Sequence, residues 1–204
     1  MTDRKDHWDG VYGARAENAL TWFEDAPEIS IDMMRHGGLR PGARVVDVGG
    51  GASRLVDALL DEGIANPTVL DLSAEALKVS KDRLGARASD VDWVVADVTQ
   101  WQPTTRFDIW HDRAVFHFLT EPKDRVAYVQ TLTNALKPGG VASIGTFALD
   151  GPETCSNLPV QRYSPETLAE ALGPAFELVK SCAHIHLTPK GNTQSFSFCV
   201  FRRL

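Results

Sequence analysis

The stretch Val45-Val46-Asp47-Val48-Gly49-Gly50-Gly51-Ala52-Ser53 is a β-branched run that ends in three glycines. The run predicts a buried strand, and the glycines predict a tight turn because glycine adopts positive φ angles at little steric cost. Leu55 and Leu59, four residues apart, open a segment with helical spacing. The stretch therefore predicts a strand, a glycine turn and a helix, which is the first unit of a doubly wound α/β sheet.

The alternation of short strands with helical segments continues from Ala43 to the end of the chain. The first five strands are predicted at Arg44–Val48, Thr68–Leu72, Asp92–Ala96, Phe107–His111 and Val141–Phe147. Most of these runs are apolar on both faces, as expected for parallel strands covered by helices. Only a turn-forming cluster separates Phe176–Ile185 from Gln194–Phe201, so these two runs must pair antiparallel. We expect a mostly parallel, Rossmann-like α/β sheet closed by an antiparallel C-terminal hairpin.

Two later helices carry clear signals at their ends. The first begins near Thr120-Glu121-Pro122, ends at Lys137-Pro138-Gly139-Gly140, and has a predicted inward face made of Val126, Val129, Leu132 and Leu136. The second begins at Ser164-Pro165-Glu166 and turns Leu168 and Leu172 inward before Gly173. Both helices are expected to pack on the sheet.

The bulk properties indicate one globular domain, with 204 residues, 43% hydrophobic and 24% charged. The net charge of -6 argues against nucleic acid, because phosphate binding needs clustered Lys and Arg. Met1–Arg15 is polar and no later stretch is apolar for long enough to cross a bilayer, so we expect a cytoplasmic protein without a membrane partner. The widely spaced Cys155, Cys182 and Cys199 predict free thiols rather than disulfides or a metal site.

The glycine turn lies at the carboxyl edge of the predicted sheet, where doubly wound folds bind ligands. A dinucleotide site favours a third glycine at position 54, where the helix N-terminus receives the pyrophosphate, and this chain has Arg54. Asp47 would repel a pyrophosphate but could meet a cationic amino group. The pattern favours an amino-acid-bearing nucleoside over a nicotinamide dinucleotide, and it leaves open a glycine turn without a ligand.

Two further acids end predicted strands. Asp71 follows the turn by about 20 residues and could accept both hydroxyls of a ribose, or could only cap the next helix. Asp97 could accept a hydrogen bond from an adenine amino group while Val98 packs on the ring, or could be a solvated loop acid. Together with the glycine turn, the two acids indicate an adenosine site.

The ordered set Asp47-x-Gly49-x-Gly51, Asp71, Asp97-Val98 and Leu136-Lys137-Pro138-Gly139-Gly140 resembles the class I, seven-β-strand, S-adenosylmethionine-dependent methyltransferases. The resemblance covers residues 43–204 and implies a seven-stranded sheet whose seventh strand is antiparallel. It also implies that Asp71 binds the ribose and Asp97 the adenine of S-adenosylmethionine. The candidate cofactor-binding residues are Trp8, Tyr12, Trp22, Asp47, Gly49, Gly51, Asp71, Leu72, Asp97, Val98 and His111.

Residues 1–42 precede this domain and are rich in large aromatic side chains, followed by an amphipathic helix that runs to Gly37. The pattern Trp8-Asp9-x-x-Tyr12 with Trp22-Phe23 resembles thiopurine-type small-molecule methyltransferases and the lysine methyltransferase of citrate synthase. That resemblance implies a cap folded over the cofactor, where aromatic faces attract a sulfonium cation and exclude water. Alternatively, these aromatics only secure the leading helix.

Substrate-facing residues are expected in His111-Asp112-Arg113, directly after the fourth strand. The citrate synthase group tends to have Lys-Gly-Thr here, which departs from this chain. Asp112 and His117 are the candidate catalytic bases, and Arg113 could hold an anionic substrate or the cofactor carboxylate. His117 could equally be a structural histidine, and His184 and His186 are weaker candidates.

The long connection after the fifth strand, from Asp150 to Tyr163, returns to the same carboxyl edge. Long loops at this edge usually contact ligands, so Arg162 and Tyr163 are the further candidate substrate contacts.

We expect a methyltransferase that uses S-adenosylmethionine, works by in-line displacement on a small-molecule acceptor and releases S-adenosylhomocysteine. A protein lysine is the alternative acceptor. The alternatives from other classes are an NAD(P)-dependent oxidoreductase and a cofactor-binding module without catalysis. The sequence leaves the oligomeric state open.

Overall fold

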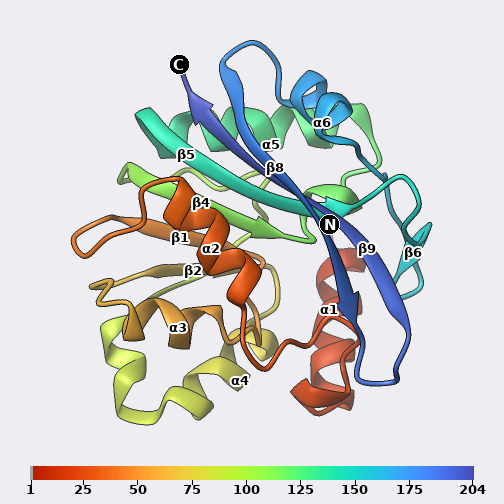
Figure 1. Cartoon of the computed structure of the whole chain (residues 1–204). Helices are drawn as coiled ribbons and strands as arrows, with labels where there is room; N and C mark the ends of the chain where they lie inside the picture. Colours follow the sequence, from red (N-terminus) through yellow and green to blue (C-terminus); the bar gives the residue numbers. More distant parts are fainter. Residues whose placement is uncertain (1) are drawn as a thin grey trace.

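The computed structural model describes residues 2–204 and contains one large sheet with helices on both faces (Figure 1). The strands are β1 Val45–Val48, β2 Thr68–Asp71, β3 Asp92–Val95, β4 Phe107–Arg113, β5 Leu136–Phe147, β8 Phe176–Leu187 and β9 Thr193–Arg203. The helices are α1 Thr2–Ala14, α2 Glu28–His36, α3 Leu55–Asp61, α4 Ala74–Leu84, α5 Pro122–Ala135 and α6 Pro165–Leu172, with 3₁₀ turns η1 Glu17–Ala19, η2 Gly85–Asp90 and η3 Phe116–Phe118.

The strand order is β3-β2-β1-β4-β5-β9-β8, and β9 pairs antiparallel with both of its neighbours. The chain moves outward from β1 to β3 and then returns to the other side of β1 with β4, so a topological switch point lies between β1 and β4. Ligands of doubly wound sheets bind at such a point, outside the carboxyl ends of the strands. The predicted seven-stranded sheet and the antiparallel C-terminal hairpin are confirmed.

Alternation along each strand divides the core between the two faces of the sheet. Val46 and Leu70 point to the face covered by α5 and α6, where they join Leu132 and Leu168. On the other face, Val45 packs against α2 and α3, and Val69 packs against α3 and α4. The apolar spacing of each helix therefore matches the face that it covers.

Local signals place the helix ends. The Ser73 side chain accepts a hydrogen bond from the Ala76 N–H at the start of α4. At α6, Ser164 and Thr167 form a reciprocal capping box, and Leu168 and Leu172 are buried as predicted. These caps satisfy N–H groups that the first helical turn leaves unpaired.

Two predictions about α5 and the segment after it were wrong. Val126 is 70% exposed, because the buried face of α5 is formed by Tyr128, Thr131, Leu132 and Ala135. Because the large Tyr128 ring is buried, the buried face of α5 lies on the Tyr128 side of the helix and excludes Val126. The Lys137–Gly140 segment was expected to precede a strand that begins at Val141, but it belongs to β5, which begins at Leu136.

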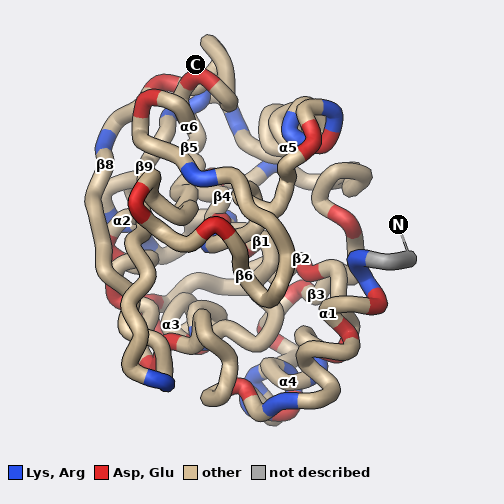
Figure 2. Tube along the Cα trace, turned by 90° about the vertical axis from the view of Figure 1, so that its right-hand side faces the viewer, with Lys and Arg blue, Asp and Glu red and all other residues tan. Residues whose placement is uncertain are grey.

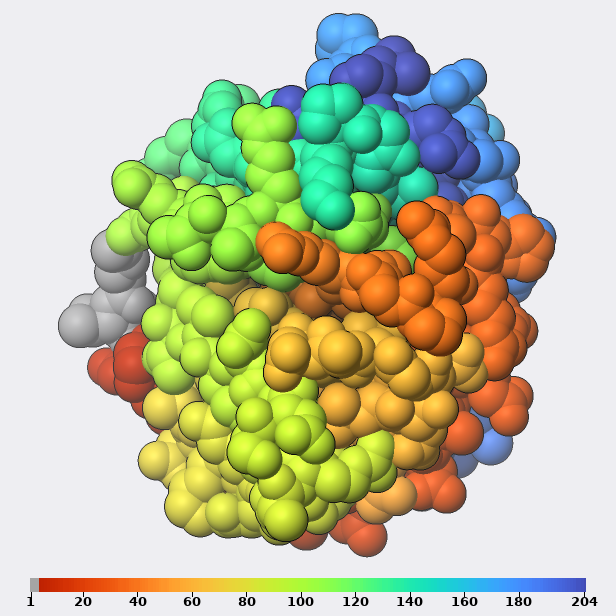
Figure 3. Space-filling model, turned by 90° about the vertical axis from the view of Figure 1, so that its left-hand side faces the viewer, coloured from red at the N-terminus to blue at the C-terminus, as the bar shows by residue number. Residues whose placement is uncertain are grey.

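The long connection after β5 is not a plain loop, since it contains a small antiparallel pair, β6 Thr154–Cys155 and β7 Leu158–Pro159. Helix α1 lies beside α4 near the carboxyl ends of the strands (Figure 1), and acidic and basic residues are interspersed over this side of the molecule (Figure 2). On the opposite side, the parts of the chain coloured orange to green form a continuous surface (Figure 3).

The same truncation should have different effects on stability at a buried and at an exposed position of α5. Leu132 is fully buried, so Leu132→Ala should lower the free energy of unfolding by about 2–4 kcal/mol through lost burial and a cavity. Val126→Ala on the exposed face should change it by less than about 0.5 kcal/mol. Urea unfolding followed by circular dichroism measures both, and equal losses would contradict this assignment of the helix face.

Candidate functional site

The glycine turn after β1 has a conformation and a packing that require glycine. Gly49 and Gly51 have φ angles of +68° and +41°. A Cβ on Gly49 would lie 2.0 Å from Val115 Cγ2, and one on Gly51 would lie 2.9 Å from Asp71 Oδ2 and 3.0 Å from the Tyr12 hydroxyl. The turn can therefore approach Asp71 and Tyr12 only because it carries no side chains.

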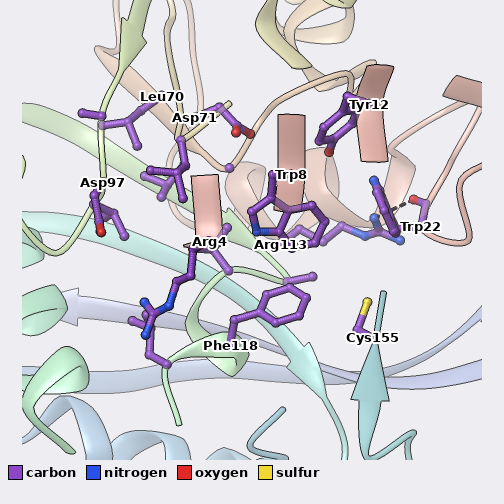
Figure 4. Close-up of a pocket in the computed structure, with 18 residues that line it drawn as sticks. Arg4, Trp8, Tyr12, Trp22, Leu70, Asp71, Asp97, Arg113, Phe118 and Cys155 are labelled. Atoms are coloured by element: carbon purple, nitrogen blue, oxygen red, sulfur yellow. Dashed lines mark hydrogen bonds between the residues drawn. The ribbon is translucent and has the colours of Figure 1, made fainter. Parts of the chain in front are cut away.

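A cavity with about 870 Å³ of empty space lies over this turn, at the carboxyl ends of β1, β2 and β4 (Figure 4). It brings together nine of the residues predicted from the sequence: Trp8, Tyr12, Trp22, Gly49, Asp71, Leu72, Asp97, Val98 and Arg113. Its walls also include Arg4, Phe118 and Cys155, which sequence reasoning did not propose as site residues. We call it the main cavity.

Asp71 and Asp97 supply the carboxylates of the main cavity. Asp71 is 7% exposed, and its Oδ1 accepts a hydrogen bond of 2.8 Å from the Ser73 N–H. Burial raises the pKa of Asp71 to about 7. Asp97 uses Oδ1 to accept bonds from the Thr99 N–H and hydroxyl, at 2.9 and 2.7 Å. Both carboxyl groups line the main cavity.

A smaller chamber of about 520 Å³ adjoins the main cavity and shares Tyr12, Trp22, Gly49 and Arg113 with it. Asp47 and His111 line this chamber, because their strands pair in register. His111 Nδ1 lies 2.7 Å from Asp47 Oδ1, while Asp47 Oδ2 and His111 Nε2 are buried without a hydrogen-bond partner. Unpaired polar atoms in a chamber are suited to a polar ligand, since leaving them unsatisfied is costly.

Aromatic rings from the N-terminal segment form the outer wall of the main cavity (Figure 4). The Trp8 ring contacts the rings of Trp22 and Phe118 edge-on, with centroids 5.7 and 5.2 Å away. Tyr12 contacts Trp22 in the same way at 6.1 Å. An ion pair between Arg4 and Asp124 connects α1 to α5. The segment thus covers the cavity with apolar ring faces and edges.

Residues 45–140 match the family model of a methyltransferase domain. The match covers just under half of the chain, and over that stretch the chain is similar to methyltransferase domains. The fold agrees, since the N-methyltransferase NodS of Bradyrhizobium japonicum WM9, solved in complex with S-adenosylhomocysteine, superposes with a TM-score of 0.73. That comparison covers 97% of this chain and 99% of NodS at 18% identity.

Two curated relatives show how diverse the acceptors of similar methyltransferases are. The eEF1A lysine and N-terminal methyltransferase of Mus musculus is 24% identical over 141 residues, which is 69% of this chain. This chain spans only 20% of that relative's length. A ubiquinone biosynthesis O-methyltransferase of Xanthomonas campestris is 29% identical over 137 residues, covering 62% of this chain and 55% of the relative.

Arg113 lines the main cavity, but most of its guanidinium is already engaged. It donates to the Trp22 carbonyl and to Glu24 Oε1, both at 2.9 Å, and lies over the Phe196 ring. Burial lowers the pKa of Arg113. The geometry therefore favours a role in holding the N-terminal segment over one in binding a substrate carboxylate.

The predicted bases Asp112 and His117 do not line the main cavity. Asp112 points to the α5 face of the sheet, opposite to its neighbour His111, and accepts bonds from the Tyr128 hydroxyl and the Val115 N–H. His117 is fully buried beside Phe147, and burial lowers its pKa to about 3. Strand alternation explains why a triplet that is continuous in sequence is divided between two faces.

The two loop residues predicted to contact substrate also lie outside the main cavity. Arg162 bonds to the Gly151 carbonyl and pairs with Glu153 within its own loop. Tyr163 is buried against Phe116 in the core. From the same connection, Cys155 reaches the cavity instead.

The described part of the chain contains no helix long and apolar enough to cross a membrane. Within that part, no three His, Cys, Asp or Glu side chains are grouped in a way that could hold a metal ion.

The raised pKa of Asp71 predicts that ligand affinity depends on pH. A ribose hydroxyl donates to an ionised carboxylate, and the pKa of Asp71 is about 7 in the free protein. The affinity for S-adenosylhomocysteine should therefore rise about tenfold between pH 6 and pH 8, as titration calorimetry would show. Asp71→Asn should bind weakly at every pH, whereas Asp97→Asn should bind weakly and keep the pH dependence. A rise of equal size in Asp71→Asn would exclude Asp71 as its source.

Proposed function

We propose that this protein transfers a methyl group from S-adenosylmethionine to a small-molecule acceptor. The observation that carries the proposal is the main cavity, where the glycine turn and two strand-end carboxyl groups meet an aromatic wall.

The residues present fit the cofactor along its whole length. Asp71 and Asp97 are suited to ribose and adenine, and both line the main cavity with Val98. Asp47 lines the adjoining chamber, and its unpaired Oδ2 is an acceptor, which suits the ammonium group of an amino acid. Between the two ends, Trp8, Tyr12 and Trp22 offer ring faces and edges that suit a sulfonium cation.

When bound, S-adenosylmethionine supplies an activated methyl group that a nucleophile displaces in line. The chain's own contribution is alignment and the exclusion of water, which are the main sources of catalysis in such a transfer. The cofactor would be oriented by the glycine turn, Asp47 and Asp71. Water would be excluded from the reacting methyl group by Trp8, Trp22 and Phe118. Because Asp112 and Glu24 are engaged and His117 is buried outside the cavity, we expect the acceptor to arrive with a free lone pair.

The small-molecule acceptor is supported by the enclosure of the site. Trp8 and Phe118 meet edge-on in the wall of the main cavity and narrow the access of larger groups. A protein lysine is the second candidate acceptor, which the name of the Mus musculus relative favours.

Arg54 argues against the dinucleotide alternative. Its guanidinium binds Glu17 and Asp25 at 2.8 and 2.7 Å, and it precedes α3 directly. The position where a third glycine would admit a pyrophosphate is therefore taken by a side chain with other partners.

Incubation with methyl-labelled S-adenosylmethionine and a fractionated cell extract tests the proposal. We expect label in the small-molecule fraction, and none with the Asp71→Asn control, whose folding is checked by circular dichroism. Label confined to protein would establish the lysine alternative instead. Binding of S-adenosylhomocysteine without any transfer would favour a non-catalytic module, and binding of NADH alone would favour an oxidoreductase.

The predicted base His117 can be tested by substitution. Burial keeps its ring neutral, with a pKa of about 3, and the ring lies against Phe118 and Phe147. His117→Phe preserves this aromatic packing, so kcat should stay within about threefold and its pH profile should be unchanged. A loss of a hundredfold or more, together with loss of one limb of the profile, would restore His117 as the base.

A further inference from the structure

Residues 17–25 lie between helix α1 and helix α2, and we call them the strap. Basic side chains from four separate elements hold the strap: Arg54, Arg83, Arg113 and His186. The bonds from Arg113 and His186 reach backbone carbonyls, those of Trp22 at 2.9 Å and Thr21 at 2.8 Å. Hydrogen bonds from basic side chains therefore hold the strap, in addition to the contacts of its aromatic residues.

Glu17, at the start of the strap, is bound by two guanidinium groups at once. Its Oε1 accepts from Arg54 at 2.8 Å and its Oε2 accepts from Arg83 at 2.7 Å. The side chains of Glu17 and Arg83 are each only 18% exposed. Partly buried, charge-assisted bonds of this kind are stronger than exposed ion pairs.

Arg83 connects Glu17 to the glycine turn. The same guanidinium donates to the carbonyls of Ala52 and Ser53, at 3.0 and 2.7 Å. Ser80, one turn earlier on α4, donates to the Gly51 carbonyl at 2.7 Å. Helix α4 thus holds the backbone of the turn and the carboxylate of the strap through neighbouring side chains.

Arg54 connects Glu17 to the aromatic wall. Its guanidinium lies 5.3 Å from the centre of the Phe23 ring, and Phe23 lines the chamber beside the main cavity. Trp22, the preceding residue, lines both the chamber and the main cavity (Figure 4). Arg54 therefore connects Glu17 to Phe23, the neighbour of Trp22 in the chain.

We propose that Glu17 is a positioning residue of the cofactor site, which couples the glycine turn to the aromatic wall through Arg83 and Arg54. Glu17 carries out no chemistry. It keeps Trp22 closed over a ligand that the turn holds, and it thereby slows the escape of that ligand. This inference rests on the proposed function, because the ligand is S-adenosylmethionine or its product.

The variant Glu17→Gln tests the proposal, with Asp25→Asn as a matched control. Asp25 also lies in the strap and pairs with Arg54, but its side chain is 83% exposed, so its loss should have little effect. We expect Glu17→Gln to raise the Kd for S-adenosylhomocysteine about tenfold, mainly through a faster dissociation rate. Calorimetry gives the Kd, and stopped-flow tryptophan fluorescence gives the rate.

Two further readouts separate positioning from a general loss of structure. The change in tryptophan fluorescence when S-adenosylhomocysteine binds should be smaller in Glu17→Gln than in the wild type. Trp22→Phe should show the same decrease. Trypsin should cut after the exposed Arg15 faster in Glu17→Gln than in the wild type, even without ligand. In an Arg83→Gln background, Glu17→Gln should cause a smaller further loss of affinity than it does alone.

The proposal is overturned if Glu17→Gln binds and releases S-adenosylhomocysteine as the wild type does. It is also overturned if Asp25→Asn matches the loss, or if affinity falls only in proportion to a lower melting temperature. Should Glu17→Gln fail to fold, Glu17→Asp keeps the charge and should show a smaller shift in the same direction. A wild type that does not bind S-adenosylhomocysteine would refute the proposed function instead, and trypsin cleavage would still test the strap.

Discussion

The close approach of the turn after β1 to its neighbours is the constraint on which the site depends. Gly49 and Gly51 take positive φ angles, and a Cβ on either would collide with Val115 or with Asp71. A side chain at Gly51 would push Asp71 and Tyr12 away from the turn, and one at Gly49 would push Val115 away. The main cavity, the chamber and the aromatic wall are therefore all arranged around a stretch of backbone without side chains.

Strand register explains which residues meet at this turn. Asp47 and His111 are Cα partners in neighbouring parallel strands, and their side chains share one face with Asp71. The next residue along β4, Asp112, points to the other face and closes a network with Tyr128 and Trp110. A shift of one residue in the β1–β4 pairing would exchange these roles and bring a structural acid into the cavity.

The sheet and the cofactor side of the site were predictable because they depend on local patterns. β-branched runs, glycine turns and strand-end acids each act through neighbouring residues, and in combination they indicated the fold and nine residues of the main cavity. The acceptor side depends on contacts between distant segments, which leave no periodic signal. His117 and Tyr163 became core residues in this way, whereas Cys155 and Phe118 reached the cavity from the same stretches of chain.

Arg54 shows how one substitution can change the kind of site that a common fold provides. In a dinucleotide-binding turn, glycine at this position leaves the helix N-terminus open to a pyrophosphate. Here the side chain reaches instead to two carboxylates of the strap, Glu17 and Asp25. The positive charge of Arg54 is neutralised by these carboxylates and is not available to a phosphate from solvent. The same guanidinium helps to hold the aromatic residues of the strap over the turn. The same residue thus disfavours one class of cofactor and helps to enclose another, because an enclosed aromatic site suits a sulfonium cation better than a solvated pyrophosphate.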